Sequence, residues 1–318
     1  MKAALALAYG PPSVIELRTV PDPVPAPGSV LVRVTASPVT AADSRMRAMD
    51  VPRGFGPILR LLIGLRRPRR PIMGMEFAGR VEQGQPGFAV GQRVFGITGL
   101  AGGCHAEKVA ISGAGRLRAI PDGLSDVEAA AFFFGGLTAH DFLVRQGGLQ
   151  SGQRLLINGA TGAVGSAAVQ IGRHLGAQVT ALCSPQNVAF ALSLGAHQAQ
   201  SYDAPWPKGP FDVVMDCAGT LPYPKFRRRL APGAHLLVVV VGSLAQHLGY
   251  TLWPRRGGVR LHVAPVADTP GAMDALIALY HAGGYRPWVG QTFAFDDIRA
   301  AHTIADTRHK RGAVVVTM

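Results

Sequence analysis

The stretch from residue 154 to 176, RLLINGATGAVGSAAVQIGRHLG, constrains the fold more than any other part of the chain. An apolar run at 155–157 has the length of a buried strand, and residues 163–175 carry apolar side chains at helical spacing. Three closely spaced glycines lie between them, Gly159, Gly162 and Gly165. Such a loop lets backbone N–H groups approach a pyrophosphate at the positive end of the following helix. The stretch therefore predicts strand, phosphate loop and helix of a dinucleotide site.

The loop departs from the usual G-x-G-x-x-G pattern, because Ala160 stands at its first glycine. The alternative interpretation is an ordinary Gly-rich turn between a strand and a helix. The strand expected before the loop and the helix expected after it favour the phosphate loop over that alternative.

The residues after the next expected strand, 178–182, bear on which dinucleotide is bound. An Asp or Glu about twenty residues after the glycines usually holds a ribose 2′-hydroxyl. No acidic residue occurs between Gly165 and Asp203, whereas Ser184 offers a hydrogen-bond donor. This pattern favours NADPH over NADH, with NADH bound at lower affinity.

Composition narrows the class of protein. The 318 residues are 48% hydrophobic and 16% charged, which is typical of a globular chain of about two domains. Three scattered cysteines, Cys104, Cys183 and Cys217, argue against a disulfide framework and against a C-x-x-C zinc site. The chain opens directly on strand-like sequence, without a signal-peptide core or an apolar span of about twenty residues, which predicts a cytoplasmic location.

The formal net charge is +13, from 32 Lys and Arg against 19 Asp and Glu. Such a charge attracts polyanions and anionic membrane surfaces. No zinc finger, RNA-recognition signature or basic repeat interleaved with aromatics accompanies it. A dispersed, solvated basic surface is therefore favoured over specific nucleic-acid binding.

The pattern of apolar residues changes along the chain. Residues 1–35 are typical of short strands separated by Pro-rich turns, and period-two alternation continues to about residue 111. Ser125 and Glu128 form a predicted capping box, after which helices alternate with strands, as in a doubly wound parallel sheet. Strands are expected at 155–157, 178–182, 211–215, 235–241, 259–263 and 313–317, and helices at 187–194, 223–230, 272–281 and 296–305.

Taken together, the segments resemble the zinc-independent quinone oxidoreductase branch of the medium-chain dehydrogenase/reductase superfamily over essentially the full length. The matching segments are MKAALALAYGPPSVIEL, PGSVLVRVTASPVTAAD, PIMGMEFAGRV, VGQRVFG, IPDGLSDVEAAAFFFGGLTA, INGATGAVGSAAVQIGRHLGA and RHKRGAVVV. The resemblance implies an α/β fold, in which a doubly wound Rossmann-type cofactor domain, residues 123–266, is inserted into a β-rich, barrel-like (GroES-like) catalytic domain, residues 1–122 and 267–318. The substrate cleft would lie between the two.

The resemblance also implies the site residues. Thr40 and Asp43 would lie at the nicotinamide end, with Thr40 donating a hydrogen bond to the acceptor oxygen and Asp43 fixing the loop. The cofactor would be held by Thr138, Gly159, Thr161, Gly162, Ala163, Val164, Gly165, Ser184, Asn187, Tyr202, Cys217, Ala218, Val241 and Gly242. Some relatives bind a 2′-phosphate with a Ser and an Arg after the second cofactor strand. Here Gln186 replaces that Arg, which predicts a weaker preference for NADPH.

Zinc-dependent members of the superfamily place Cys and His ligands where this chain has Thr40 and Met75. Their four-cysteine lobe is also absent, since only Cys104 lies in that region. No metal site is therefore predicted. Hydride acceptors that are already electron-poor, such as quinones and α,β-unsaturated carbonyl compounds, are favoured.

Two further features have competing interpretations. Cys104 and His105 suggest a nucleophile and its base, but neighbours in a strand point to opposite faces, so packing is favoured. Asp216 ends an expected strand, where a carboxylate meets the cofactor edge or has a purely structural role.

Residues 53–70, RGFGPILRLLIGLRRPRR, combine an apolar helix with a cluster of four arginines, Arg66, Arg67, Arg69 and Arg70. A lid over an apolar substrate pocket is the favoured interpretation. Contact with an anionic membrane or with nucleic acid is the alternative.

The leading hypothesis is a zinc-independent, NADPH-dependent oxidoreductase that transfers hydride to a quinone or an α,β-unsaturated carbonyl compound. The alternative is a basic NADPH-binding protein that acts mainly through RNA or membrane-surface contact. A homodimer through the cofactor domain is expected, because the strands at 235–241 and 259–263 fall where the family joins two sheets, and a bare apolar edge would be unfavourable.

Overall fold

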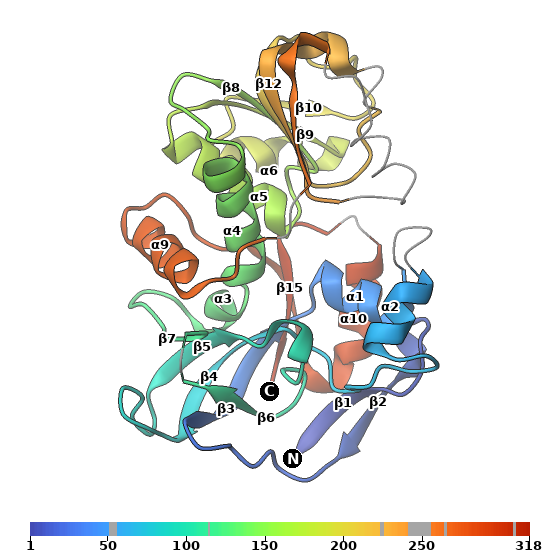
Figure 1. Ribbon diagram of the computed structural model, residues 1–318, viewed down its shortest axis with the longest axis vertical. Coiled ribbons are helices and arrows are strands. Elements are labelled where there is room, and N and C mark those ends of the chain that lie inside the picture. The colour runs from blue at the N-terminus through green and yellow to red at the C-terminus, as the bar shows by residue number, and fades with distance from the viewer. Residues whose placement is uncertain (51–55, 114, 223–225, 241–255, 264–265, 308–309) are drawn as a thin grey trace.

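The computed structural model describes residues 1–50, 56–113, 115–222, 226–240, 256–263, 266–307 and 310–318. Two large sheets dominate it, one in each half of the elongated molecule (Figure 1). The N-terminus and the C-terminus both lie in the half that holds the mainly antiparallel sheet (Figure 1). None of the helices in the described part of the chain has the length and apolar character needed to cross a bilayer.

The six-stranded sheet is parallel throughout, in the order β10-β9-β8-β11-β12-β13. Its strands are β8 (Arg154–Asn158), β9 (Gln178–Cys183), β10 (Gln198–Ser201), β11 (Phe211–Asp216), β12 (Leu230–Val238) and β13 (Arg260–His262). In sequence order this arrangement reads 3-2-1-4-5-6, the doubly wound order of dinucleotide-binding folds. Helices α5 (Ala163–His174) and α6 (Val188–Ser193) follow β8 and β9.

The seven-stranded sheet takes strands from both ends of the chain, in the order β14-β15-β3-β4-β5-β7, with β6 also paired to β3. Its strands are β3 (Ser29–Pro38), β4 (Glu76–Gln83), β5 (Arg93–Ile97), β6 (Lys108–Ser112), β7 (Leu117–Ala119), β14 (Val289–Ala294) and β15 (Ala313–Thr317). A separate hairpin joins β1 (Lys2–Ala6) to β2 (Ile15–Thr19). Because β15 pairs with β3, the C-terminal tail completes the N-terminal sheet, which confirms the predicted fold class.

The remaining helices connect or cover these sheets. They are α1 (Ala41–Ala48), α2 (Gly56–Ile63), α3 (Asp126–Ala130), α4 (Phe133–His140), α9 (Pro270–His281) and α10 (Ile298–Asp306), and a π-helical segment, Asp141–Gln146, continues α4. The largest apolar core runs across the junction of the two halves, where the rings of Phe95 and Phe133 stack at 4.5 Å between centroids.

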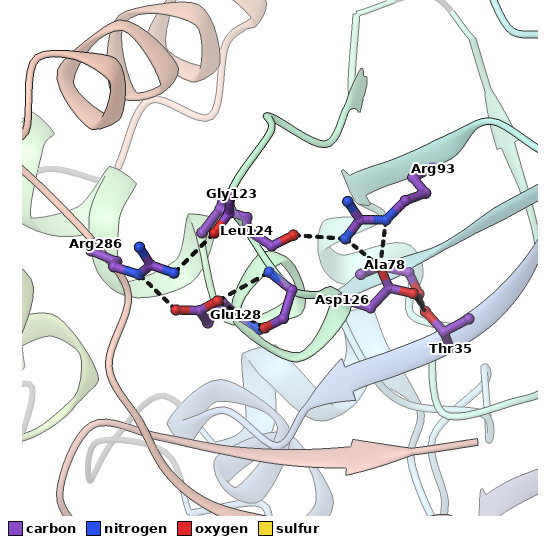
Figure 2. A network of polar contacts seen from close by, with 9 residues as sticks. Thr35, Ala78, Arg93, Gly123, Leu124, Asp126, Glu128 and Arg286 are labelled. Atoms are coloured by element: carbon purple, nitrogen blue, oxygen red, sulfur yellow. Dashed lines mark hydrogen bonds and ion pairs between the residues drawn. The ribbon is translucent and has the colours of Figure 1, made fainter.

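The chain passes from one half to the other at the start of α3, where a polar network holds it in place (Figure 2). The predicted capping box is confirmed, because the Ser125 hydroxyl accepts from the Glu128 N–H and the Glu128 carboxylate accepts from the Ser125 N–H. Arg93 of β5 binds Asp126 at 2.6 Å, and Arg286 binds Glu128 at 2.7 Å. This anchoring lies beside the predicted boundary at 122/123. That boundary and the one at 266/267 stay predictions.

The structure differs from the expected elements in several places. Helix α1 and the strands β7, β10 and β14 were not predicted. In the expected helix at 223–230, residues 223–225 lie outside the described residues, Arg227–Arg229 form a 3-10 turn, and β12 already begins at Leu230. The apolar strand β12 is not an edge, because β11 and β13 pair with it on either side.

Candidate functional site

The predicted phosphate loop joins β8 to α5 with its backbone closely packed. Gly159 has φ +78°, a conformation that favours glycine, and a Cβ on Gly165 would stand 2.0 Å from the Gly159 carbonyl oxygen. Gly162 is the N-cap of α5, and no side chain caps that end of the helix. The N–H groups of Ala163 and Val164 lie in the uncapped first turn of this twelve-residue helix, where the helix dipole favours an anion. These glycines and the uncapped turn fit a dinucleotide pyrophosphate.

The turn after β9 lies against this loop. Ser184 begins it without a side-chain capping bond, and the buried Asn187 donates from Nδ2 to the Thr161 hydroxyl at 3.2 Å. The Tyr202 N–H donates to the Cys183 carbonyl oxygen at 3.0 Å, which places Tyr202 beside the same strand end. Burial raises the pKa of Tyr202 to about 12. The structure thus brings four predicted residues, Thr161, Ser184, Asn187 and Tyr202, to one end of the sheet.

The loop after β11 forms the opposite side. A Cβ on Gly159 would stand 3.1 Å from the Ala218 Cβ, and the Cys217 N–H donates to the Asn158 carbonyl oxygen at 3.0 Å. The Asp216 carboxylate accepts hydrogen bonds from the Asn158 amide and from the backbone N–H groups of Ala218, Gly219 and Leu221, at 2.7–3.2 Å. Asp216 is therefore engaged in holding this loop, which favours the structural interpretation of that residue. Val241 and Gly242 lie outside the described residues.

Thr138 lies on α4, which packs tightly on α5. A Cβ on Gly135 of α4 would stand 2.5 Å from the Ala163 carbonyl oxygen at the start of α5. The Thr138 hydroxyl donates to the Phe134 carbonyl oxygen at 2.6 Å within its own helix. The role of Thr138 toward a cofactor stays a prediction.

Thr40 and Asp43 form the N-terminal cap of α1. The Thr40 hydroxyl donates to Asp43 Oδ2 at 2.6 Å, the Thr40 N–H donates to the same oxygen at 2.9 Å, and Asp43 Oδ1 accepts from the Gly74 N–H at 3.1 Å. Both side chains are buried. Asp43 thus joins two loops, in agreement with a fixing role. The hydroxyl hydrogen of Thr40 is directed at Asp43, so donation to a substrate would require it to exchange partners.

Sequence reasoning missed two ionisable groups near this cap. Burial raises the pKa of Glu76 to about 8, and the negative charge of Asp43 raises it as well. Hydrogen bonds from the backbone of Phe134 and Phe133 oppose the rise. The Lys310 ammonium donates to the Val39 carbonyl oxygen at 3.2 Å, and burial lowers the pKa of Lys310 to about 8, although Asp43 opposes this. A charged residue between apolar neighbours in PIMGMEFAGRV was the available signal for Glu76.

The pair Cys104–His105 behaves as packing. Both residues are buried, and they precede β6 rather than lying within a strand, so the geometric premise of the prediction was wrong. The Cys104 thiol contacts the Thr98 hydroxyl at 3.2 Å, while His105 Nε2 contacts the Pro38 carbonyl oxygen at 3.1 Å. Burial raises the pKa of the Cys104 thiol well above its usual range. The thiol and the imidazole are not paired with each other.

The positions where zinc relatives hold their metal carry no comparable donor set. Thr40 is bonded to Asp43, and the Met75 carbonyl oxygen accepts from the N–H groups of Thr98 and Gly99. Within the ranges that the structure describes, no three His, Cys, Asp or Glu side chains are grouped as metal ligands.

A dinucleotide-dependent enzyme fold is thus defined by the sheet order and the glycine loop, and comparisons with known proteins identify its family. The model of the alcohol dehydrogenase GroES-like domain matches residues 26–140, and the model of a zinc-binding dehydrogenase matches residues 194–316. The chain belongs to the medium-chain dehydrogenase/reductase superfamily, in its quinone oxidoreductase branch.

Three similar proteins illustrate the range of relatives. A zinc-type alcohol dehydrogenase-like protein of Schizosaccharomyces pombe is 34% identical over 62% of this chain and 58% of its own length. A trans-enoyl reductase of Aspergillus terreus is 33% identical over 71% of this chain and 65% of its own. The quinone oxidoreductase of Thermus thermophilus, solved alone and with NADPH, is 28% identical with a TM-score of 0.78 over the full length of both chains. The chain thus spans less than two thirds of these two curated relatives.

Proposed function

We propose that the chain is a zinc-independent, NADPH-dependent oxidoreductase that reduces a quinone or an α,β-unsaturated carbonyl compound. The observation that carries the proposal is the glycine loop, in which Gly165 packs closely on the Gly159 carbonyl oxygen next to the uncapped first turn of α5. The Thermus relative solved with NADPH and the fungal relative named for trans-enoyl reduction support it. The nicotinamide ring of the bound cofactor would supply the hydride.

The chain's own residues would bind and orient the two reactants. Residues 159–165 hold the pyrophosphate, and Ser184, Asn187 and Tyr202 surround the adenosine ribose. Thr40, held by Asp43, lies at the nicotinamide end and hydrogen-bonds the acceptor oxygen after its hydroxyl hydrogen exchanges partners. Reduction also takes up one proton, which a quinone can obtain from solvent.

Oxidation of NADPH, followed in absorbance with a panel of quinones, enals and enones, tests the proposed reaction. The assay is run with and without a strong chelator. Turnover of at least one of these acceptors, unchanged by the chelator, is the expected result. Loss of activity on chelation would refute zinc independence, and turnover of simple alcohols alone would refute the acceptor class.

Thr40→Val tests the hydroxyl at the nicotinamide end. The change removes one hydrogen bond to the acceptor, so turnover should fall by about 2-fold to 10-fold while the Kd for NADPH stays constant. Thr40→Ser is the matched control, because it keeps both the hydroxyl and the cap of α1 and should retain turnover. Equal turnover in Thr40→Val and the wild type would remove the proposed role.

Ser184→Asp tests the preference for NADPH. Ser184 is a neutral donor, and Gln186 stands where relatives have an Arg, so we expect a moderate preference of about 1 to 3 kcal/mol, or about 5-fold to 150-fold in Kd. A carboxylate at position 184 would repel a 2′-phosphate and accept a 2′-hydroxyl, so Ser184→Asp should prefer NADH. Ser184→Ala controls for loss of the hydroxyl alone. Equal or tighter binding of NADH by the wild type contradicts the assignment.

A second candidate function rests on the surface of α2 and the residues after it. Leu61 is 64% exposed and Leu65 is 66% exposed, next to the exposed Arg66 and Arg67. The lid role predicted for residues 53–70 and a contact with RNA or an anionic membrane both remain proposals, and residues 53–55 lie outside the described part. Binding to anionic vesicles or RNA, measured against salt, separates them, since phosphate contacts weaken steeply as salt rises. Absence of binding at physiological salt would eliminate the second function.

The assembly that we propose is a homodimer through β13, the short edge strand of the six-stranded sheet. Its three residues are partly exposed, and among the described strands β13 pairs only with β12, so a strand of a second copy could pair with its other edge. Light scattering over a tenfold dilution at micromolar concentration should report a dimer. A monomer throughout that range would contradict it.

A further inference from the structure

The chain returns to the phosphate loop just before its last strand. Gly312 forms a parallel bridge with Gly162, and its N–H donates to the Thr161 carbonyl oxygen at 2.8 Å. Gly312 has φ +57°, and a Cβ there would stand 2.1 Å from the Trp288 carbonyl oxygen. The backbone around residue 312 is therefore fixed against the loop that is proposed to hold the pyrophosphate.

This placement sets the position of Arg311, whose side chain crosses to the turn after β9. Its Nε donates to Asn187 Oδ1 at 2.5 Å, and Nη2 donates to the Gln186 carbonyl oxygen at 2.6 Å. The guanidinium carbon lies 5.8 Å from the centre of the Phe190 ring. Asn187 in turn donates to the Thr161 hydroxyl. Arg311 is thus held between the phosphate loop and the turn that begins with Ser184.

The charge of Arg311 is not neutralised by the residues that hold it. Its two hydrogen-bond acceptors are neutral, and within the described part of the chain no carboxylate lies within ion-pair distance of it. No Asp or Glu occurs between Gly165 and Asp203, the segment that forms this side of the site. A guanidinium carries five N–H donors in a rigid fork, so donors on Nη1 remain for an anion.

The Arg311 guanidinium lies at the turn after β9, which has no positively charged residue of its own at position 186. Relatives that bind a 2′-phosphate carry an Arg where this chain has Gln186, and Arg311 is bonded to the carbonyl oxygen of Gln186 itself. Resting on the proposed function, we infer that Arg311 binds the 2′-phosphate of NADPH, so that the cationic contact comes from the C-terminal end of the chain rather than from the turn after β9.

The experiment measures the Kd of NADPH and of NADH, by titration of reduced-nicotinamide fluorescence, for the wild type and Arg311→Gln. Loss of a charge-assisted hydrogen bond should raise the Kd of NADPH by about 10-fold to 100-fold, while the Kd of NADH should change by less than about twofold. The fragments 2′,5′-ADP and 5′-AMP, used as competitors, should show the same difference. Retained NADH affinity in Arg311→Gln also shows that the variant is folded.

Arg154→Gln is the matched control for net charge. Arg154 also stacks on a phenylalanine, with its guanidinium 5.2 Å from the Phe211 ring, and donates to a carbonyl oxygen, that of Lys208, but it begins β8 at the opposite end of the strand from the loop. Arg154→Gln should leave the ratio of the two Kd values within about twofold of the wild type, since remote exposed charges are largely screened by salt. Arg311→Lys, which keeps the charge without the fork, should retain part of the preference and replaces Arg311→Gln if that variant does not fold.

Three results would overturn the inference. If Arg311→Gln raised the Kd of NADPH and of NADH by the same factor, Arg311 would only position Asn187 or contact the pyrophosphate. If neither Kd changed, Arg311 would have only a structural role, as a contact between the two halves of the chain. If the wild type bound neither cofactor, the proposed function would fail together with the inference, whereas a wild type that binds NADPH with an unchanged ratio in Arg311→Gln refutes the inference alone.

Discussion

Replacement of Glu76 by Gln should make the protein progressively more stable than the wild type as the pH rises. Glu76 is the first residue of β4, its side chain is 3% exposed, and its Oε2 has no hydrogen-bond partner among the described residues. Burial raises its pKa from 4.5 to about 8. Between these two values the native state keeps a proton that the unfolded chain releases, so stability is full below the lower value and decreases as the pH rises toward the upper one.

The size of the effect follows from the two pKa values. A shift from 4.5 to about 8, at about 1.4 kcal/mol per unit, makes the ionised form cost about 5 kcal/mol once the pH exceeds 8. Urea unfolding at about pH 5 and at about pH 9 would give the free energy of unfolding of the wild type and of Glu76→Gln. The difference between them should grow by several kcal/mol across this interval, because Gln cannot ionise.

Glu82→Gln is the control on the same strand. Its carboxylate is bonded to Arg33 and Lys108, which hold the pKa of Glu82 below its usual value, so it stays ionised in both states across this pH range. The effect of Glu82→Gln on stability should therefore be the same at both pH values. A difference between wild type and Glu76→Gln that does not change with pH would refute the reasoning about Glu76.

Two other predictions follow from packing and burial. Gly165→Ala should weaken the binding of both cofactors by more than about tenfold, because its Cβ would stand 2.0 Å from the Gly159 carbonyl oxygen, whereas Gly271→Ala, with open space around the added carbon, should bind as the wild type does. Burial raises the pKa of Cys104, Cys183 and Cys217, so a thiol reagent at about pH 8 should label the native protein far more slowly than the guanidinium-unfolded chain; rapid labelling of native Cys104 would contradict this.

Several regular elements of the cofactor half were predictable because their signals are local, although β10 was missed and the helix expected at 223–230 was not found at 227–230. The strand at 155–157 and the helix at 163–175 were placed within one or two residues of β8 and α5, since glycines and a change of period mark both boundaries. The final strand, Ala313–Thr317, was placed correctly because an unbroken β-branched run follows Gly312. Local patterns of this kind need no knowledge of which segments meet.

The misses also have physical reasons. Helix α1, AADSRMRA, has no apolar face, so its hydrophobic pattern gave no signal, although Thr40 and Asp43 have the spacing of a helix cap. The same two residues were predicted to act at the nicotinamide end, and the sequence gives no way to see that the Thr40 hydrogen is directed at Asp43. The bond from Arg311 to Asn187 joins residues 124 positions apart, and no local pattern predicts such a pair.

The placement of the 19 acidic residues bears on the proposed preference for NADPH. Several of the acidic side chains are engaged inside the fold: Asp216 accepts three hydrogen bonds from its own loop and one from Asn158 of β8, Asp43 caps α1, and Asp306 pairs with the buried Arg47. Residues 166–202, which include the residues proposed to surround the adenosine ribose, contain no acidic residue. In the proposed complex, the phosphates would face the positive end of α5 and the Arg311 guanidinium, whose hydrogen-bond acceptors among the described residues are both neutral. The proposed preference for NADPH would therefore depend on where the carboxylates are placed as well as on the arginine.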